Sequence, residues 1–197
     1  MNIHDIAREA LESMPPASRF GAEDREVILR YTDYLLSLED EFVGGFYETL
    51  FEHPPTRAVF REGERPMREE SLRAWWQRTV TGPIDDDYFA WMAMVGLLHV
   101  VRGVANPMML AMCEHAARFV DSATARAGLP RDESDRVTVA FRRFTTSVGS
   151  VITFGYDQAV TDALFNIAGM RKTLLERLRN QEVEEALVEA RQMLSRP

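Results

Sequence analysis

Apolar residues recur at spacings of three and four along most of the chain, which is the pattern of helices that bury one face. No segment alternates apolar and polar residues as a half-buried strand does. Proline and glycine interrupt the pattern, as at Pro15-Pro16 and Gly82-Pro83, because proline lacks a backbone donor and clashes with the preceding turn. The pattern predicts an all-α fold with helices at about residues 2–13, 23–39, 40–53, 66–81, 85–103, 106–128, 132–167 and 171–195.

The length of the chain limits the number of domains. With 197 residues and 46% hydrophobic content, the chain can form one sizeable core and is short for two ordinary domains. Helices joined by short connections form either a bundle or a globin-like stack. Periodicity alone does not choose between these two architectures.

A histidine occupies the apolar face of the helix expected at 85–103. Phe89, Met92, Gly96, His99 and Gly103 are spaced by three or four residues and therefore form one stripe. The two glycines leave room for something flat and wide to approach the backbone, and a buried imidazole has to be neutral and either hydrogen-bonded or metal-bound. The alternative is a core histidine with a satisfied hydrogen bond and glycines that only permit close helix packing.

Three segments resemble the protoglobins and the globin domains of globin-coupled sensors. VGLLHVVRGV resembles their proximal-histidine signature, TGPIDDDYFAWMAM resembles the approach to it, and FVGGFYETLFEHP resembles their distal helix. The likeness covers about residues 25–165. It implies a globin-like helical stack with an extra N-terminal helix and a C-terminal helical tail, divided as 1–20, 21–168 and 169–197.

The resemblance also implies a cofactor, haem b (iron protoporphyrin IX). By this likeness His99 is the axial ligand of the iron and Tyr47 is the distal tyrosine that contacts bound gas. Val43, Tyr47, Leu50 and Phe51 also share an apolar face, so Tyr47 is expected to point inward. A buried tyrosine hydroxyl needs a partner, and the alternative to bound gas is a backbone carbonyl.

The helix expected at 66–81 is predicted to roof the pocket. Either tryptophan of the Trp75-Trp76 pair is expected to pack on the porphyrin, although both are also plausible core residues. Ser71 falls where some relatives place a second polar distal residue. The predicted cofactor-binding residues are Phe46, Tyr47, Phe51, Ser71, Trp75, Trp76, Met92, Val95, Gly96, His99 and Gly103, with His99 as the metal ligand.

One segment departs from the family pattern. Many globin-coupled sensors follow the proximal segment with a proline and then a tryptophan-tyrosine pair, where this chain has Asn106, Pro107, Met108 and Met109. The departure puts in doubt any signalling route through that tyrosine. It leaves the iron ligand in place.

Composition excludes several other classes of function. The net charge of −8 argues against nucleic-acid binding, because such proteins usually carry a basic patch. Cys113 is the only cysteine, so no internal disulfide forms and a cytoplasmic location is expected. The N-terminus does not resemble a signal peptide, and no apolar run approaches the roughly 18–20 residues of a membrane-spanning helix.

The remaining histidines and the cysteine do not form a second metal site. His4, His53 and His115 are isolated in sequence, without the paired spacing of zinc or di-iron ligands. Glu114 and His115 are expected on an exposed polar face, and Cys113 is expected to be a small core residue.

These observations favour a haem-based sensor of a diatomic gas (O2, CO or NO) that is not an enzyme. The alternative is a non-haem, globin-like interaction module in which His99 is structural. Filling of the pocket by Trp75, Trp76, Met92 and Met94 would favour that alternative. Peroxidase or nitric-oxide dioxygenase chemistry ranks last, because no acid–base pair and no reductase segment is evident.

The partner expected for the chain is a second copy. A homodimer through the long helix near 132–167 is predicted, since two-fold pairing is the commonest oligomer and this helix has more apolar positions than one face needs. The charged helix at 171–195 is either packed on the body or the start of a coiled coil. The residues expected at the dimer interface are Val137, Phe141, Phe144, Val148, Val151, Ile152 and Gly155.

Overall fold

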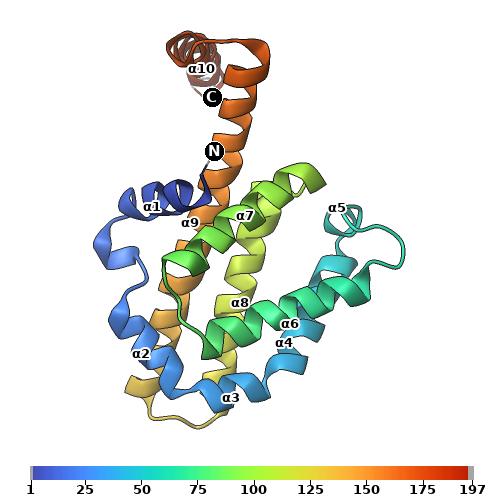
Figure 1. Cartoon of the computed structure of the whole chain (residues 1–197), viewed down its shortest axis with the longest axis vertical. Helices are drawn as coiled ribbons and strands as arrows, with labels where there is room; N and C mark the ends of the chain where they lie inside the picture. The colour runs from blue at the N-terminus through green and yellow to red at the C-terminus, as the bar shows by residue number, and fades with distance from the viewer. Residues whose placement is uncertain (1, 195–197) are drawn as a thin grey trace. The chain divides into compact units, whose positions relative to one another are not determined.

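The computed structural model describes residues 2–194 and is all-α, with no strand in that part of the chain (Figure 1). The predicted all-α, globin-like fold is confirmed. The chain divides into two compact units, Met1–Tyr156 and Asp157–Pro197. The predicted boundaries at residues 20 and 168 stay predictions, and residues 1 and 195–197 of the predicted segments lie outside the described residues. The elements are α1 (Ile3–Glu12), η1 (Pro16–Ser18), α2 (Ala22–Arg30), α3 (Thr32–Ser37), α4 (Glu39–Glu52), α5 (Pro54–Arg57), α6 (Arg65–Thr81), α7 (Asp86–Arg102), α8 (Asn106–Arg126), α9 (Arg131–Ala168) and α10 (Lys172–Leu194).

The helix expected at 23–39 is wrong as a single element. The chain leaves helical geometry at Tyr31, with φ −107° and ψ 17°, and continues as α3. The hydroxyl of Thr32 donates to the carbonyl of Val80 on α6 at 2.8 Å. A hydroxyl that bonds backbone groups outside its own helix competes with regular helix, so the break lies where α3 docks on α6.

Local residues set both ends of α7, the helix that carries His99. The Asp85 carboxylate accepts a hydrogen bond from the backbone N–H of Tyr88 at 3.0 Å and so caps the first turn. Gly103 ends the helix with φ 70°, a left-handed conformation that glycine adopts without steric cost. Gly103 therefore ends the helix. This structural role differs from the expected one, which was to make room for a flat group.

Gly96, the other glycine of the predicted stripe, is required by the crossing of α7 and α9. A Cβ added there would lie 2.6 Å from the carbonyl oxygen of Ile152. A second close approach occurs at Gly155, where a Cβ would lie 3.4 Å from the carbonyl oxygen of Ala93. The expectation that Gly96 leaves room for a cofactor is wrong, because the space beside it is taken by the backbone of α9.

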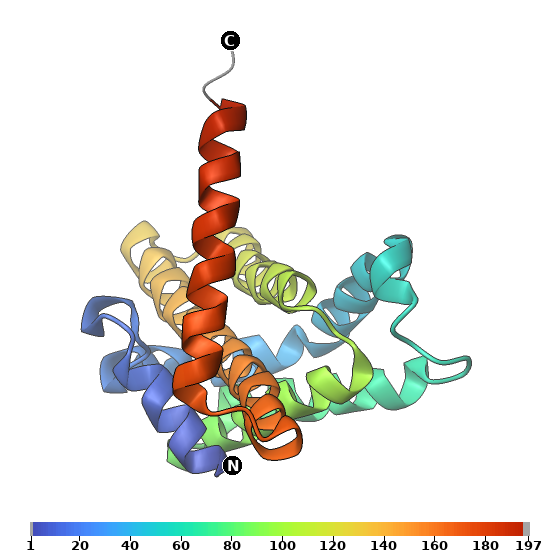
Figure 2. The same cartoon turned by 90° about the horizontal axis from the view of Figure 1, so that it is seen from above.

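Trp76 belongs to the core between α3, α4 and α6. Its side chain has no exposed surface, its Nε1–H donates to the carbonyl of Leu35 at 2.9 Å, and its ring stacks on Phe42 with centroids 4.3 Å apart. The alternative that one tryptophan is plain core therefore holds for Trp76. Figure 1 shows α4 and α6 side by side, and Figure 2 shows α1 lying against α7.

The side chains predicted for a dimer interface lie inside the chain's own core. Val137, Phe141, Phe144 and Val151 have no exposed surface, and Val148 and Ile152 are at most 5% exposed. Helix α9 meets α8 at Gly149 and meets α7 and α1 at Gly155, so these buried positions are used within the protomer. A homodimer stays a prediction, but these residues cannot form its interface without opening the core.

In the second unit, α10 has no buried residue. Among its apolar side chains, Leu174, Leu178 and Leu187 are 40% to 46% exposed, and Leu194 is 87% exposed. None of the described helices combines the length and the apolar character needed to cross a membrane.

Candidate functional site

An apolar cavity of about 570 Å³ lies in the first unit, among residues of α4, α6, α7, α8 and α9. This volume is within the range of sites that enclose small molecules and cofactors. Its wall is built mainly of aliphatic, aromatic and methionine side chains, with a few polar residues, among them Tyr47, His99, Arg68 and Arg102. Such a site suits a large apolar ligand with one polar end.

The cavity brings together seven of the eleven predicted residues and leaves four outside. Phe51, Trp76, Gly96 and Gly103 do not line it. The ring of Phe51 instead packs on Phe60 with centroids 5.0 Å apart, and the other three have the structural tasks described above. The predicted residues that do line the cavity are Phe46, Tyr47, Ser71, Trp75, Met92, Val95 and His99.

His99 lies in the last turns of α7, with its side chain half-buried at the cavity wall. Its Nδ1 is buried and has no hydrogen-bond partner within residues 2–194. Burial lowers the pKa of the imidazole to about 4, and the charge of Arg102 acts in the same direction. The ring is therefore neutral at pH 7, which is the form that binds metal ions.

His99 differs from His115, whose Nε2 is also unpaired, because the ring of His99 lies at the wall of the cavity. An orphaned buried polar atom costs about 1–3 kcal/mol and is rare in folded proteins. Proximal ligation by a histidine is one of the established ways in which proteins hold haem iron. A neutral imidazole at the wall of a large apolar cavity fits such a group.

Tyr47 extends from α4 and is 6% exposed. Its ring contacts Phe46 and Phe60, with centroids 5.7 and 5.9 Å away. No hydrogen bond joins its hydroxyl to any described residue, and burial raises the pKa of the phenol well above its ordinary value. Tyr47 therefore offers the cavity a neutral donor that is free to bond a ligand.

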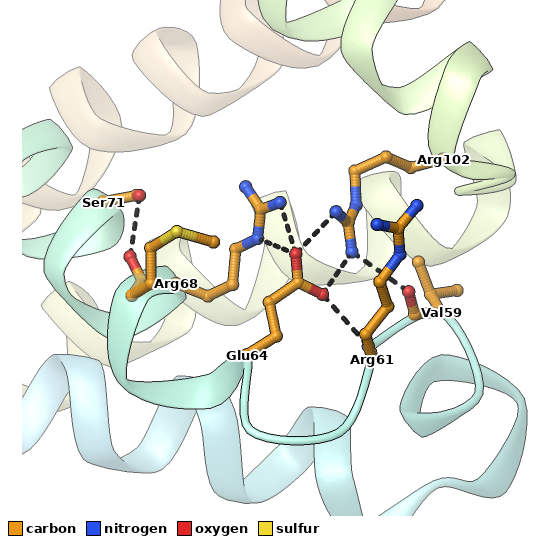
Figure 3. Close-up of polar contacts among 7 residues, drawn as sticks. Val59, Arg61, Glu64, Arg68, Ser71 and Arg102 are labelled. Carbon is orange, nitrogen blue, oxygen red and sulfur yellow. Dashed lines mark hydrogen bonds and ion pairs between the residues drawn. The ribbon is translucent and has the colours of Figure 1, made fainter.

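Ser71 and Trp75 line the cavity from α6, as predicted, but the serine hydroxyl is already engaged. It donates to the carbonyl of Met67 at 2.9 Å (Figure 3). The side chain of Trp75 packs near Phe42 and Phe144, with centroids 6.1 and 6.0 Å away. Of the two predicted distal polar groups, Tyr47 is thus the one with an unused donor.

Residues that the sequence analysis assigned elsewhere, or did not single out, complete the wall. Val148 and Ile152, predicted for the dimer interface, line the cavity, as do Met108 and Met109, which mark the departure from the family pattern. Arg102 comes three residues after His99 and thus falls on the same side of α7, a spacing from which it could have been predicted.

The expectation of an exposed polar face at Glu114 and His115 is right for the first residue only. His115 is half-buried, its ring meets Phe46 edge-on at 5.7 Å, and its Nε2 has no partner among the described residues. Cys113 lines the cavity, and burial raises the pKa of its thiol to about 12. Within residues 2–194, no group of three or more histidine, cysteine, aspartate or glutamate side chains is placed to hold a metal ion.

The sequence matches the model of the protoglobin family over residues 10–153. The chain belongs to the protoglobin family. The matched stretch runs from α1 into α9 and contains every residue that lines the cavity, so the site lies within the protoglobin part of the chain. A search of curated proteins finds no match.

Proposed function

We propose that this chain holds haem b in the cavity, with His99 as the axial ligand, and reversibly binds a diatomic gas. The observation that carries the proposal is the neutral His99 with its unpaired nitrogen at the wall of a 570 Å³ apolar cavity. The protoglobin match supports it, since globins of this kind typically bind gas through haem. The haem iron, when bound, supplies the site at which the gas coordinates.

The protein's own groups have separable roles in this proposal. His99 offers a neutral nitrogen to the metal, and its position near the end of α7 links the ligand to the α7–α9 crossing at Gly96. The apolar wall lowers the local polarity, which strengthens each remaining polar contact. Tyr47 presents an unused hydroxyl that can donate to a bound gas carrying partial negative charge.

The non-haem alternative is less well supported. It expects the pocket to be filled by its own tryptophan and methionine side chains. Trp76 lies in the core away from the cavity, while Trp75, Met92 and Met94 line the cavity and leave it open. An open cavity of this size favours a ligand that is not part of the chain.

We assign the chain a sensing or carrying role instead of a catalytic one. The polar groups on the cavity wall include no carboxylate, so the acid–base pair that peroxidase chemistry needs is not provided there. The cytoplasmic location and the homodimer stay predictions.

Haem titration tests the proposal. Trp75 and Trp91 line the cavity, so binding of haem there should quench tryptophan emission as the Soret band develops. We expect both signals to saturate together at one haem per chain. If neither signal saturates, the chain does not bind haem. If the Soret band changes without quenching, haem binds outside this cavity.

A further inference from the structure

Two arginines that line the cavity, Arg68 and Arg102, share the carboxylate of Glu64 (Figure 3). Arg102 donates from Nη1 to Oε1 of Glu64 and from Nη2 to Oε2, both at 2.6 Å. Arg68 donates from Nε and Nη2 to the same Oε1 at 2.9 and 2.5 Å. The backbone N–H of Arg61 adds a bond to Oε2 at 3.0 Å, so both oxygens of Glu64 are fully occupied.

This cluster ties three parts of the fold together at the cavity. Arg102 also donates to the carbonyl of Val59 at 3.1 Å, which lies in the segment between α5 and α6. Glu64 precedes α6, Arg68 lies in its first turns, and Arg102 is the last residue of α7. Val59, Arg68 and Arg102 all line the cavity, whereas Glu64, which lies between the two arginines in Figure 3, does not line it.

The charges of the cluster do not balance. Two guanidinium groups and one carboxylate leave a net charge of +1. Most of this charge is withdrawn from solvent, because the side chains of Glu64, Arg102 and Arg68 are 8%, 21% and 30% exposed. Hydrogen bonding from Arg102 holds the pKa of Glu64 far below its ordinary value, so the carboxylate is ionised at any physiological pH.

The two arginines also keep unused donors. Each guanidinium has five N–H groups. Within the described residues, Arg68 uses two of them and Arg102 uses three. The remaining N–H groups can donate hydrogen bonds to a planar carboxylate, the anion that arginine recognises best.

We propose that Arg68 and Arg102 bind a propionate carboxylate of the haem, and that Glu64 is the positioning residue that holds their guanidinium groups at the cavity. This inference rests on the proposed function and adds the direction in which the porphyrin enters the cavity. One propionate matches the unbalanced positive charge. Because Arg102 follows His99 by three residues on α7, one helix presents both the iron ligand and an anchor for the edge of the ring.

Comparison of haem with its dimethyl ester tests the subsite, because the ester removes the negative charge and keeps the ring and the iron. The measurement is the rate at which ferric haem passes to an excess of a haem-scavenging globin. We expect the wild-type protein to release the ester about 10- to 100-fold faster than haem, the range set by loss of charge-assisted hydrogen bonds. Arg102→Met and Arg68→Met should reduce that ratio to below about threefold each.

Arg65→Met is the matched control. Arg65 lies on the same helix and pairs with Glu69 at 2.6 Å, but it does not line the cavity. Its ratio of ester to haem release should equal that of the wild type. Because the ratio compares two ligands in one variant, general loosening of the fold does not imitate the effect.

The Glu64→Gln variant tests whether Glu64 acts by orienting the two guanidinium groups or only through the net charge of the cluster. The substitution raises the net charge of the cluster, so a purely electrostatic effect would increase the ratio. We expect the ratio to fall, because the guanidinium groups lose the carboxylate that orients them. A higher ratio would show that Glu64 competes with the propionate and would overturn its positioning role.

The outcomes separate this inference from the proposed function. If the wild type binds haem and its dimethyl ester equally well, the subsite is wrong and haem binding at His99 stands. If the wild type binds neither, both proposals fall. If Arg65→Met lowered the ratio of ester to haem release as much as Arg102→Met and Arg68→Met do, the subsite would also be wrong.

Discussion

Replacing His99 with alanine is expected to abolish stoichiometric haem binding. The imidazole is the one side chain of the cavity wall that is a neutral nitrogen ligand, so its removal leaves the apolar wall and the two arginines to hold the porphyrin without a bond to the iron. Haem titration followed at the Soret band measures the effect. The variant should fail to reach one haem per chain at concentrations that saturate the wild type.

The fold of the haem-free variant should be intact. Nδ1 of His99 makes no hydrogen bond to a described residue, so the alanine variant loses no polar partner and removes a buried unsatisfied group. Helix content and the urea midpoint of the haem-free protein should stay close to those of the wild type. His53→Ala, at an exposed position, is the matched control and should bind haem normally. Retention of one haem with an unchanged ferrous spectrum in His99→Ala would exclude His99 as the ligand.

Replacing Tyr47 with phenylalanine is expected to accelerate the release of dioxygen. Bound dioxygen carries partial negative charge, and the Tyr47 hydroxyl has no competing partner among the described residues. Loss of one such hydrogen bond costs about 1–3 kcal/mol, which corresponds to roughly 5- to 150-fold in rate. Stopped-flow dissociation measures this change. Carbon monoxide, which carries less negative charge when bound, should change far less.

Tyr34→Phe is the control for this prediction. The hydroxyl of Tyr34 donates to the carbonyl of Ala123 at 2.6 Å, away from the cavity. This variant should release both gases at the wild-type rates. Equal small changes for dioxygen and carbon monoxide in Tyr47→Phe would instead make Tyr47 a packing residue. The donor would then be an ordered water, since the hydroxyl of Ser71 already bonds the carbonyl of Met67.

Features that depend on near neighbours could be predicted from the sequence. The periodicity located the long helices, and the Asp85 cap and the Gly103 stop of α7 are recognisable within a few residues. The apolar helix faces and the family resemblance predict His99, Tyr47 and Trp75 as site residues, and all three line one cavity in the structure. The break at Tyr31 was missed because it accompanies a contact between Thr32 and Val80, which are 48 residues apart in sequence.

Features that depend on distant partners could not be predicted. The sequence shows that Gly96 is small, but only the crossing with Ile152 shows that backbone occupies the space beside it. Likewise, the apolar surplus of α9 does not reveal whether another copy or the chain itself covers it. The pairing of Glu64 with Arg102 spans 38 residues and left no local signal.

The absorption spectrum of the haem-loaded protein, before and after reduction and then with carbon monoxide, tests the central claim most directly. We expect a Soret band that shifts on reduction, shifts again on carbon monoxide addition and returns when the gas is removed. A ferrous spectrum that carbon monoxide leaves unchanged, or one identical to that of free haem, would contradict gas binding at a haem held by His99.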